Sequence, residues 1–217
     1  MATYVLIHGA GDGGWYWHLV HAELRTRGHD VVAPDLPAGD DTLELSAYAQ
    51  AVVDTIGDRR DPVVVGQSFG AFTAPLVCAR VPSRLLVLVA GMIPSPGEPP
   101  DDWWANTGHD REVHVPEDVV AAYYNDVPPE LAAEARRRER AHPSPASRKP
   151  WPLRAWPDVP TRVLACRDDR LFPPSFLGRV TRERLGIVPD EIDGGHCVAL
   201  SHPWELADRL EEYVAGF

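Results

Sequence analysis

The amino-acid sequence predicts an α/β fold in which a parallel sheet is covered by helices on both faces. Short strand-like runs alternate with helix-like patterns along most of the chain. Each strand-like run is apolar throughout, as strands are when both faces of a sheet are buried. In addition, the hydrophobic content of 44% and the charged content of 24% are those of a globular protein, which excludes disordered, collagenous and coiled-coil chains.

Four strands and three helices are predicted before residue 94. The strands are short apolar runs at 4–7, 31–33, 63–65 and 85–89, and the helices between them lie at 15–27, 45–56 and 68–80. The second helix has the clearest pattern, because Leu45, Ala49, Val52, Val53 and Ile56 recur at the spacing of one helical face.

The end of the chain returns to the same alternation. A fifth strand is predicted at 162–165 and a helix at 175–185. A sixth strand is predicted to begin at Ile187 and Val188, and the last helix covers 204–217 with Pro203 at its first position.

The middle of the chain, residues 94–160, has a different composition. It holds 13 of the 22 prolines and four of the seven tryptophans, but two of the 17 glycines. Pro116 opens a predicted helix that reaches Tyr124, and a second is predicted from Glu130 to about Arg140. This stretch therefore reads as an insertion rather than as a continuation of the sheet.

Charge and cysteine content limit the classes of function. The net charge of −11 argues against a nucleic-acid partner, and no apolar run approaches the roughly 20 residues that span a membrane. Cys78, Cys166 and Cys197 are widely spaced without a CxxC pair, so neither a disulfide framework nor a structural metal site is expected. Free thiols and the lack of a basic-then-apolar leader predict a cytoplasmic location.

The strongest chemical signal is the sequence Gly66-Gln67-Ser68-Phe69-Gly70, a G-x-S-x-G motif between a predicted strand and a predicted helix. In such a turn the serine hydroxyl projects clear of the sheet, and glycines are needed where side chains would collide with neighbouring backbone. The motif predicts that Ser68 is a nucleophile.

A serine nucleophile needs a base and an acid that orients the base. His196 lies in the Gly-rich loop after the sixth strand, whereas His202 precedes Pro203 and suits a capping or surface position. The acid is expected at the carboxyl end of the fifth strand, where Asp168 and Asp169 are adjacent and cannot both point inward. Asp169 is favoured, since Arg167 and Arg170 can pair with Asp168 at the surface.

These positions divide the chain. Ser68 precedes residues 94–160, whereas Asp169 and His196 follow them, so the two flanks are expected to fold as one catalytic core (1–93 and 161–217). Residues 94–160 are expected to form a cap over the site.

Acyl transfer also needs donors for the developing oxyanion. One is the backbone N–H of Phe69, and a second is expected from the loop at 7–15, after the first strand. The glycines of this loop also raise the alternative of a dinucleotide-binding turn, but their spacing departs from G-x-G-x-x-G. No cofactor is therefore expected.

Together, His8-Gly9-Ala10, the Ser68 turn, Asp169 and His196 resemble the landmarks of the α/β-hydrolase superfamily, in that family's order. The resemblance spans nearly the whole chain. It is greatest to small esterases of the plant methylesterase and hydroxynitrile lyase group and their bacterial relatives, on HGAGDGGWYW at 8–17 and YYND at 123–126.

The resemblance implies an α/β-hydrolase fold with six mostly parallel strands, because the family's first two strands are absent, and a helical cap. It also implies that Ala10 supplies the second oxyanion N–H. Hydroxynitrile lyases have a lysine after the catalytic histidine and a threonine in the oxyanion loop, where this chain has Cys197 and Ala10. Lyase chemistry is thereby disfavoured.

The cap is expected to contribute to the substrate pocket. Its candidate aromatic residues are Trp103, Trp104, Tyr123, Tyr124, Trp151 and Trp156. Trp104 and Tyr124 are assigned to the pocket, together with Gly9, Asp12 and Cys197. The competing interpretation is that these rings only pack the cap onto the sheet. The acidic surface favours neutral over anionic substrates.

The sequence therefore predicts a serine esterase that cleaves a small to medium-sized, uncharged carboxylic ester through an acyl-enzyme, without cofactor or metal. A monomer or homodimer with no membrane or nucleic-acid partner is expected. Two alternatives stay open: a C–C lyase using the same triad, and a non-catalytic binding protein on a hydrolase scaffold.

Overall fold

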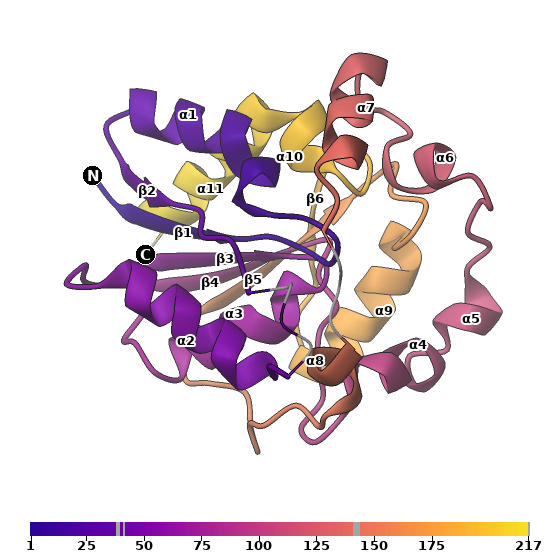
Figure 1. The fold of residues 1–217 in the computed structure, drawn as a ribbon, viewed down its shortest axis with the longest axis horizontal. Coiled ribbons are helices and arrows are strands. Elements are labelled where there is room, and N and C mark those ends of the chain that lie inside the picture. Colours follow the sequence, from indigo (N-terminus) through magenta and orange to yellow (C-terminus); the bar gives the residue numbers. More distant parts are fainter. Residues whose placement is uncertain (38–39, 41, 141–143, 217) are drawn as a thin grey trace.

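The computed structural model describes residues 1–37, 40, 42–140 and 144–216 and confirms the predicted fold class (Figure 1). The strands are β1 (Thr3–Ile7), β2 (Asp30–Val32), β3 (Val63–Gln67), β4 (Leu85–Val89), β5 (Thr161–Cys166) and β6 (Asp190–Ile192). They form a six-stranded sheet in the order β2-β1-β3-β4-β5-β6, in which every neighbouring pair is parallel.

Helices cover both faces of the sheet, as Figure 1 shows. On one face lie α1 (His18–Thr26), α10 (Val198–Ser201) and α11 (Pro203–Ala215), with the 3₁₀ turn η1 (Gly14–Trp17) leading into α1. On the other lie α2 (Leu45–Ile56), α3 (Gly70–Cys78) and α9 (Pro174–Leu185).

The alternation of side chains along each strand divides the interior into two cores. In β1, Tyr4 and Leu6 pack in the core beneath α1 and α11, whereas Val5 and Ile7 pack against α2 and α3. Successive strand side chains point to opposite faces, so a strand buried on both sides must be apolar at each position. This is the physical origin of the continuous apolar runs in the sequence.

Several predicted element boundaries are wrong, three of them by enough to matter. The sixth strand begins at Asp190 rather than at Ile187, because Gly186 ends α9 in a left-handed conformation and Pro189 lacks an N–H for a ladder. The helix predicted at 15–27 is a 3₁₀ turn followed by α1. The helix predicted from Ser68 begins at Gly70, since Ser68 itself is in a left-handed conformation.

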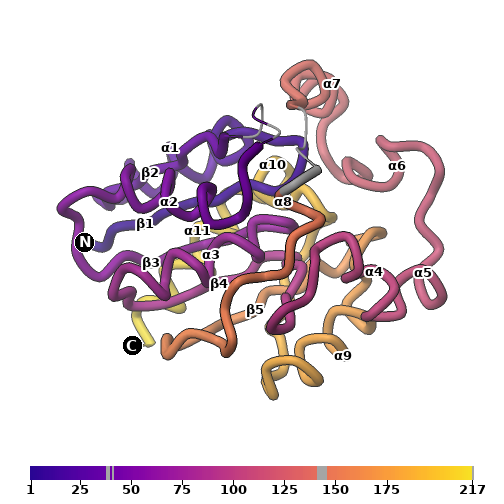
Figure 2. Tube along the Cα trace, turned by 60° about the horizontal axis from the view of Figure 1, so that its bottom comes forward, coloured from indigo at the N-terminus to yellow at the C-terminus, as the bar shows by residue number. Residues whose placement is uncertain are grey.

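Residues 94–160 carry short helices at the carboxyl ends of the strands (Figure 1). These are η2 (Pro100–Asp102), α4 (Trp103–Asn106), α5 (His109–Glu112), α6 (Val119–Tyr123), α7 (Pro129–Arg137) and α8 (Ser144–Arg148). The two helices predicted here exist but are shorter. In Figure 2, α6 and α7 lie at the opposite end of the molecule from the two termini. The division into core and cap stays a prediction.

Candidate active site

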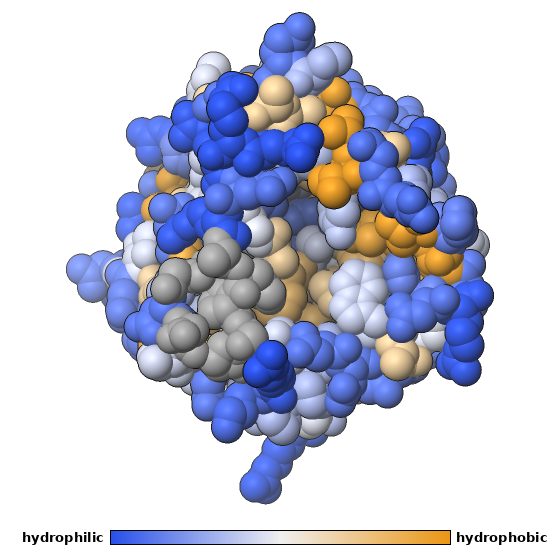
Figure 3. Space-filling view, turned by 45° about the vertical axis from the view of Figure 1, so that its right-hand side comes forward, coloured by the Kyte–Doolittle hydropathy of each residue, from blue (hydrophilic) through white to orange (hydrophobic). Residues whose placement is uncertain are grey.

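A cavity of about 300 Å³ lies between the carboxyl ends of the strands and the segment 94–160. Figure 3 shows the hollow from outside, with neutral and apolar side chains in its depth and hydrophilic side chains around it. All the residues to which the sequence assigned a role in the pocket or oxyanion hole border it, as do two of the three triad candidates: Gly9, Ala10, Asp12, Ser68, Phe69, Trp104, Tyr124, His196 and Cys197.

Ser68 sits on a strained turn between β3 and α3. Its φ is +49°, in the left-handed region that non-glycine residues rarely adopt. A Cβ at Gly66 would lie 2.8 Å from Ala74 Cβ and 2.8 Å from the Gly70 carbonyl oxygen. One at Gly70 would lie 2.7 Å from the carbonyl oxygens of both Ile7 and His8. Both motif glycines are therefore required by close approach of backbone, as the sequence predicts.

This contact leads to a stability prediction. Gly70→Ala should lower the free energy of unfolding by about 2 kcal/mol or more, because the added methyl meets two backbone oxygens that cannot move without shifting the end of β1. Gly178→Ala in α9 is the matched control: its Cβ would meet nothing nearer than 3.7 Å, so the higher helix propensity of alanine should stabilise by up to about 1 kcal/mol. Urea unfolding of both variants measures the two changes in the free energy of unfolding. Equal changes in Gly70→Ala and Gly178→Ala would contradict the prediction.

His196 borders the cavity and is hydrogen-bonded to the buried side chain of Asp169. Its Nδ1 lies 2.9 Å from Asp169 Oδ2, and both side chains are buried. The other oxygen of Asp169 accepts N–H groups from Leu171 and Phe172, each at 2.8 Å. The carboxylate is thus held by three hydrogen bonds, and it directs His196 Nε2 away from itself. Phe172 packs edge-on against the imidazole with ring centroids 5.1 Å apart.

Asp168 points elsewhere. Its side chain is exposed, and its N–H donates to the Gly194 carbonyl at 2.9 Å. The two arginines expected to pair with Asp168 have other partners: Arg167 forms ion pairs with Glu191 and Asp193, and Arg170 donates a hydrogen bond to the Ala121 carbonyl. Asp169 is therefore the aspartate that meets His196, although the surface pairing anticipated for its neighbour is wrong.

The loop after β1 is held by His8. The buried imidazole accepts the Leu36 N–H at Nε2 (3.0 Å), so its Nδ1 carries the proton and donates to the Gly9 carbonyl at 2.8 Å. These bonds fix the backbone just before Ala10, which borders the cavity together with Phe69 and Ser68. Ala10 and Phe69 are the two residues whose backbone N–H groups are predicted to serve as oxyanion donors.

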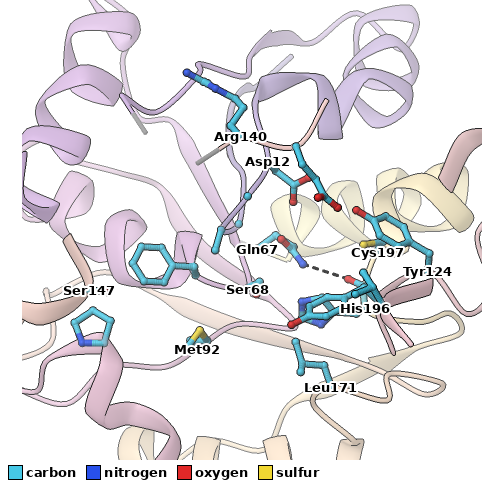
Figure 4. A pocket seen from close by; sticks show the side chains of 18 of the residues that line it. Asp12, Gln67, Ser68, Met92, Tyr124, Arg140, Ser147, Leu171, His196 and Cys197 are labelled. Atoms are coloured by element: carbon cyan, nitrogen blue, oxygen red, sulfur yellow. Dashed lines mark hydrogen bonds between the residues drawn. The ribbon is translucent and has the colours of Figure 1, made fainter. Parts of the chain in front are cut away.

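Gln67 is a site residue that sequence reasoning missed. It is 1% exposed, borders the cavity beside Ser68 and donates through Nε2 to the His196 carbonyl at 3.2 Å (Figure 4). The available signal was a polar side chain at the end of an otherwise apolar strand. Met92, Asp101, Glu139, Arg140, Ser147 and Leu171 also border the cavity and were not anticipated.

The six candidate aromatic residues separate into two groups. Trp104, Tyr123 and Tyr124 border the cavity. Trp103 and Trp151 are fully buried and donate to the carbonyls of Ile93 and Phe72, and Trp156 donates to Thr161 Oγ1 at 3.0 Å. The packing interpretation therefore holds for the second group.

Asp12 and Cys197 border the cavity, and burial raises the pKa of both side chains. Burial raises the pKa of Asp12 to about 7; the nearby His196 opposes this rise and Glu139 adds to it. In Figure 4 Asp12 points toward the cavity, whereas the Arg140 side chain extends away from it. Burial also raises the pKa of the Cys197 thiol well above its usual value, so this side chain lines the cavity as a neutral thiol rather than as a thiolate nucleophile.

The shift at Asp12 predicts a pH-dependent stability. The carboxyl ionises near pH 4 in the unfolded chain and near pH 7 in the folded one, so the folded state holds an extra proton between these values and stability falls as pH rises through this window. Asp12→Asn carries no such penalty and should gain up to about 4 kcal/mol over the parent at pH 8 relative to pH 4, at about 1.4 kcal/mol for each unit of the pKa difference. Chemical denaturation at both pH values tests this, and a pH-independent difference would contradict it.

No group of three or more His, Cys, Asp or Glu side chains in the described residues is arranged to hold a metal ion. No helix in those same ranges is long and apolar enough to cross a membrane.

Comparisons with known proteins agree with the observed fold. A family model described as "Alpha/beta hydrolase family" matches residues 4–209. Norfluorocurarine synthase 1 of Strychnos sp is 24% identical, over 96% of this chain and 94% of its own length. Methylesterase 10 of Arabidopsis thaliana is 30% identical, over 99% and 92%. The crystal structure of polyneuridine aldehyde esterase covers 99% of both chains with a TM-score of 0.83 and 20% identity.

Proposed function

The chain belongs to the alpha/beta hydrolase family, and we propose that within this family it is a serine esterase that cleaves a small to medium-sized, uncharged carboxylic ester. The observation that carries the proposal is the buried pair of His196 and Asp169, joined at 2.9 Å, in which His196 borders the same cavity as Ser68 on its strained turn. Relatives named as esterases and methylesterases support the same reaction class.

The proposed reaction begins with proton transfer. His196 takes the Ser68 hydroxyl proton at Nε2, because Nδ1 is engaged by Asp169. Ser68 Oγ then attacks the ester carbonyl, and the oxygen that gains negative charge is met by the N–H groups of Ala10 and Phe69. Asp169 stays ionised and stabilises the imidazolium.

The tetrahedral intermediate then collapses. His196 returns its proton to the leaving alcohol, and the acyl group stays on Ser68 as an ester. Water enters, His196 removes its proton, and a second oxyanion forms in the same place. Collapse of this second intermediate releases the carboxylic acid and restores the Ser68 hydroxyl. The overall reaction consumes only the ester and one water molecule, and it releases the alcohol and the carboxylic acid.

The pocket chemistry supports an uncharged substrate. Trp104, Tyr123 and Tyr124 offer aromatic surface to an apolar acyl or alcohol group. Asp12, Asp101 and Glu139 also border the cavity, and these acidic side chains disfavour a substrate that carries a carboxylate in addition to its ester group. We propose that the segment 94–160 acts as a cap that sets this preference.

The test is a series of p-nitrophenyl esters of increasing acyl length, combined with a fluorophosphonate probe. We expect turnover of the shorter esters and stoichiometric labelling at Ser68, located by mass spectrometry of the digested protein. Absence of turnover across the series, or labelling at another residue, would overturn the proposal.

The C–C lyase alternative has its own discriminator. A lyase would use Ser68, His196 and Asp169 as acid and base without acylation, so a cyanohydrin would turn over in enzyme whose Ser68 resists the probe. The residue after His196 weighs against it: Cys197 is a buried, neutral thiol, which supplies no positive charge to a departing cyanide. A non-catalytic binding protein would show neither labelling nor turnover.

A further inference from the structure

The cap meets the loop of His196 through the side chain of Asp126. This residue follows α6, and its Oδ2 accepts the Gly195 N–H at 2.7 Å. Gly195 directly precedes His196. A carboxylate from the cap therefore holds the Gly194–Gly195 peptide group, one residue before the proposed general base.

The neighbouring residue makes the same kind of contact with the loop of the triad acid. Asn125 Nδ2 donates to the Asp168 carbonyl at 3.1 Å, next to Asp169 in sequence. The two catalytic loops are themselves joined, because the Asp168 N–H donates to the Gly194 carbonyl at 2.9 Å. Two consecutive cap residues thus hold both loops from which the His196–Asp169 pair projects.

The glycines before His196 leave space for this contact. A Cβ at Gly195 would lie 2.5 Å from Asp126 Oδ1 and 2.6 Å from Asn125 Oδ1. Gly194 has a φ of +120°, and a Cβ there would lie 2.8 Å from His202 Nδ1. That imidazole nitrogen is in turn 3.4 Å from Asp126 Oδ2. Backbone without side chains is what allows the cap to approach so closely.

The contact also carries a cost. The Oδ1 atoms of Asn125 and Asp126 are buried and have no hydrogen-bond partner among the described residues. A buried acceptor without a partner disfavours the folded state.

We propose that Asn125 and Asp126 form a cap latch: positioning residues that align His196 with Asp169 and Ser68 when the cap is seated. The inference rests on the proposed function. Because the latch touches the loops and not the ester, its loss should act on the chemical step more than on substrate binding. A misplacement of about 1 Å in a catalytic group lowers the rate by about 10²-fold.

The test compares three variants. Asp126→Ala removes the acceptor and should lower kcat for a p-nitrophenyl ester by about 10²-fold, with KM changed by less than about threefold. Asp126→Asn keeps an oxygen able to accept the Gly195 N–H and should recover kcat to within about tenfold of the parent. The rate of fluorophosphonate labelling of Ser68 should follow kcat in both.

The matched control is Asp118→Ala in the same cap. Asp118 also accepts a backbone N–H, that of Ala121 at 2.8 Å, where it caps α6 without touching either catalytic loop. Loss of the Asp118 carboxylate should destabilise the folded protein about as much as Asp126→Ala does, but it should leave kcat within about threefold of the parent. Equal kcat losses in Asp118→Ala and Asp126→Ala, or an unchanged kcat in Asp126→Ala, would overturn the latch. Failure of the esterase proposal is distinct, because the parent would then neither turn over esters nor be labelled.

Discussion

Ser68→Ala should lower kcat for a p-nitrophenyl ester by at least about 10⁴-fold while leaving the fold intact. The substitution removes only the hydroxyl group, and without its oxygen the acyl-enzyme cannot form. The remaining acceleration would come from the oxyanion donors and from substrate binding, which together are worth about 10³–10⁴ over water. Steady-state kinetics and the loss of fluorophosphonate labelling are the measurements.

A second substitution separates catalysis from stability at the same position. The φ of +49° at Ser68 is as unfavourable for alanine as for serine, whereas glycine adopts it freely. Ser68→Gly should therefore be equally inactive but no less stable in thermal unfolding than Ser68→Ala. Retention of full ester turnover by either variant would show that Ser68 is not the nucleophile.

Asp169→Asn should lower kcat by about 10⁴-fold with little change in KM. Asn can still accept the N–H groups of Leu171 and Phe172 through its oxygen, so the loop keeps its shape. Its NH₂ group would then face His196 Nδ1, which must become an acceptor, and the proton moves to Nε2. An imidazole in that tautomer cannot take the Ser68 proton.

The adjacent residue offers the control for this prediction. The Asp168 side chain is exposed, and within the described part of the chain only its main-chain groups are hydrogen-bonded, so Asp168→Asn should keep kcat within about twofold. Both variants have the same change in charge and lie one residue apart. A larger loss in Asp168→Asn than in Asp169→Asn would reverse the assignment of the triad acid.

The elements that the sequence predicted well have local causes. The core strands are continuous apolar runs because each is buried on both faces, and the helix at 45–56 has one apolar face. The Ser68 turn was recognisable because neighbouring atoms lie too close to Gly66 and Gly70 for either to carry a Cβ. At Gly66 these atoms belong to residues a few positions further along the chain, and at Gly70 they belong to the end of β1. The start of β6 was misplaced where a proline interrupts an apolar run.

The roles of individual site residues depend on contacts that no local pattern contains. Trp103 and Trp104 are adjacent and identical in type, yet one is buried in the core and the other borders the cavity. Gln67 was missed because its partner is a carbonyl 129 residues away. The catalytic assignments of Ser68, Asp169 and His196 stay predictions until the kinetic tests above.

Sequence alone was sufficient for the alternation of the six strands with the main helices that cover them and for the tight turn at Ser68, because apolar periodicity and glycine placement act over a few residues. The tertiary structure decided which of two adjacent aspartates meets His196, which aromatic rings face the cavity, and that Asn125 and Asp126 hold both catalytic loops. Each of these depends on the direction of a side chain relative to a segment far away in the chain, and that direction is set by packing.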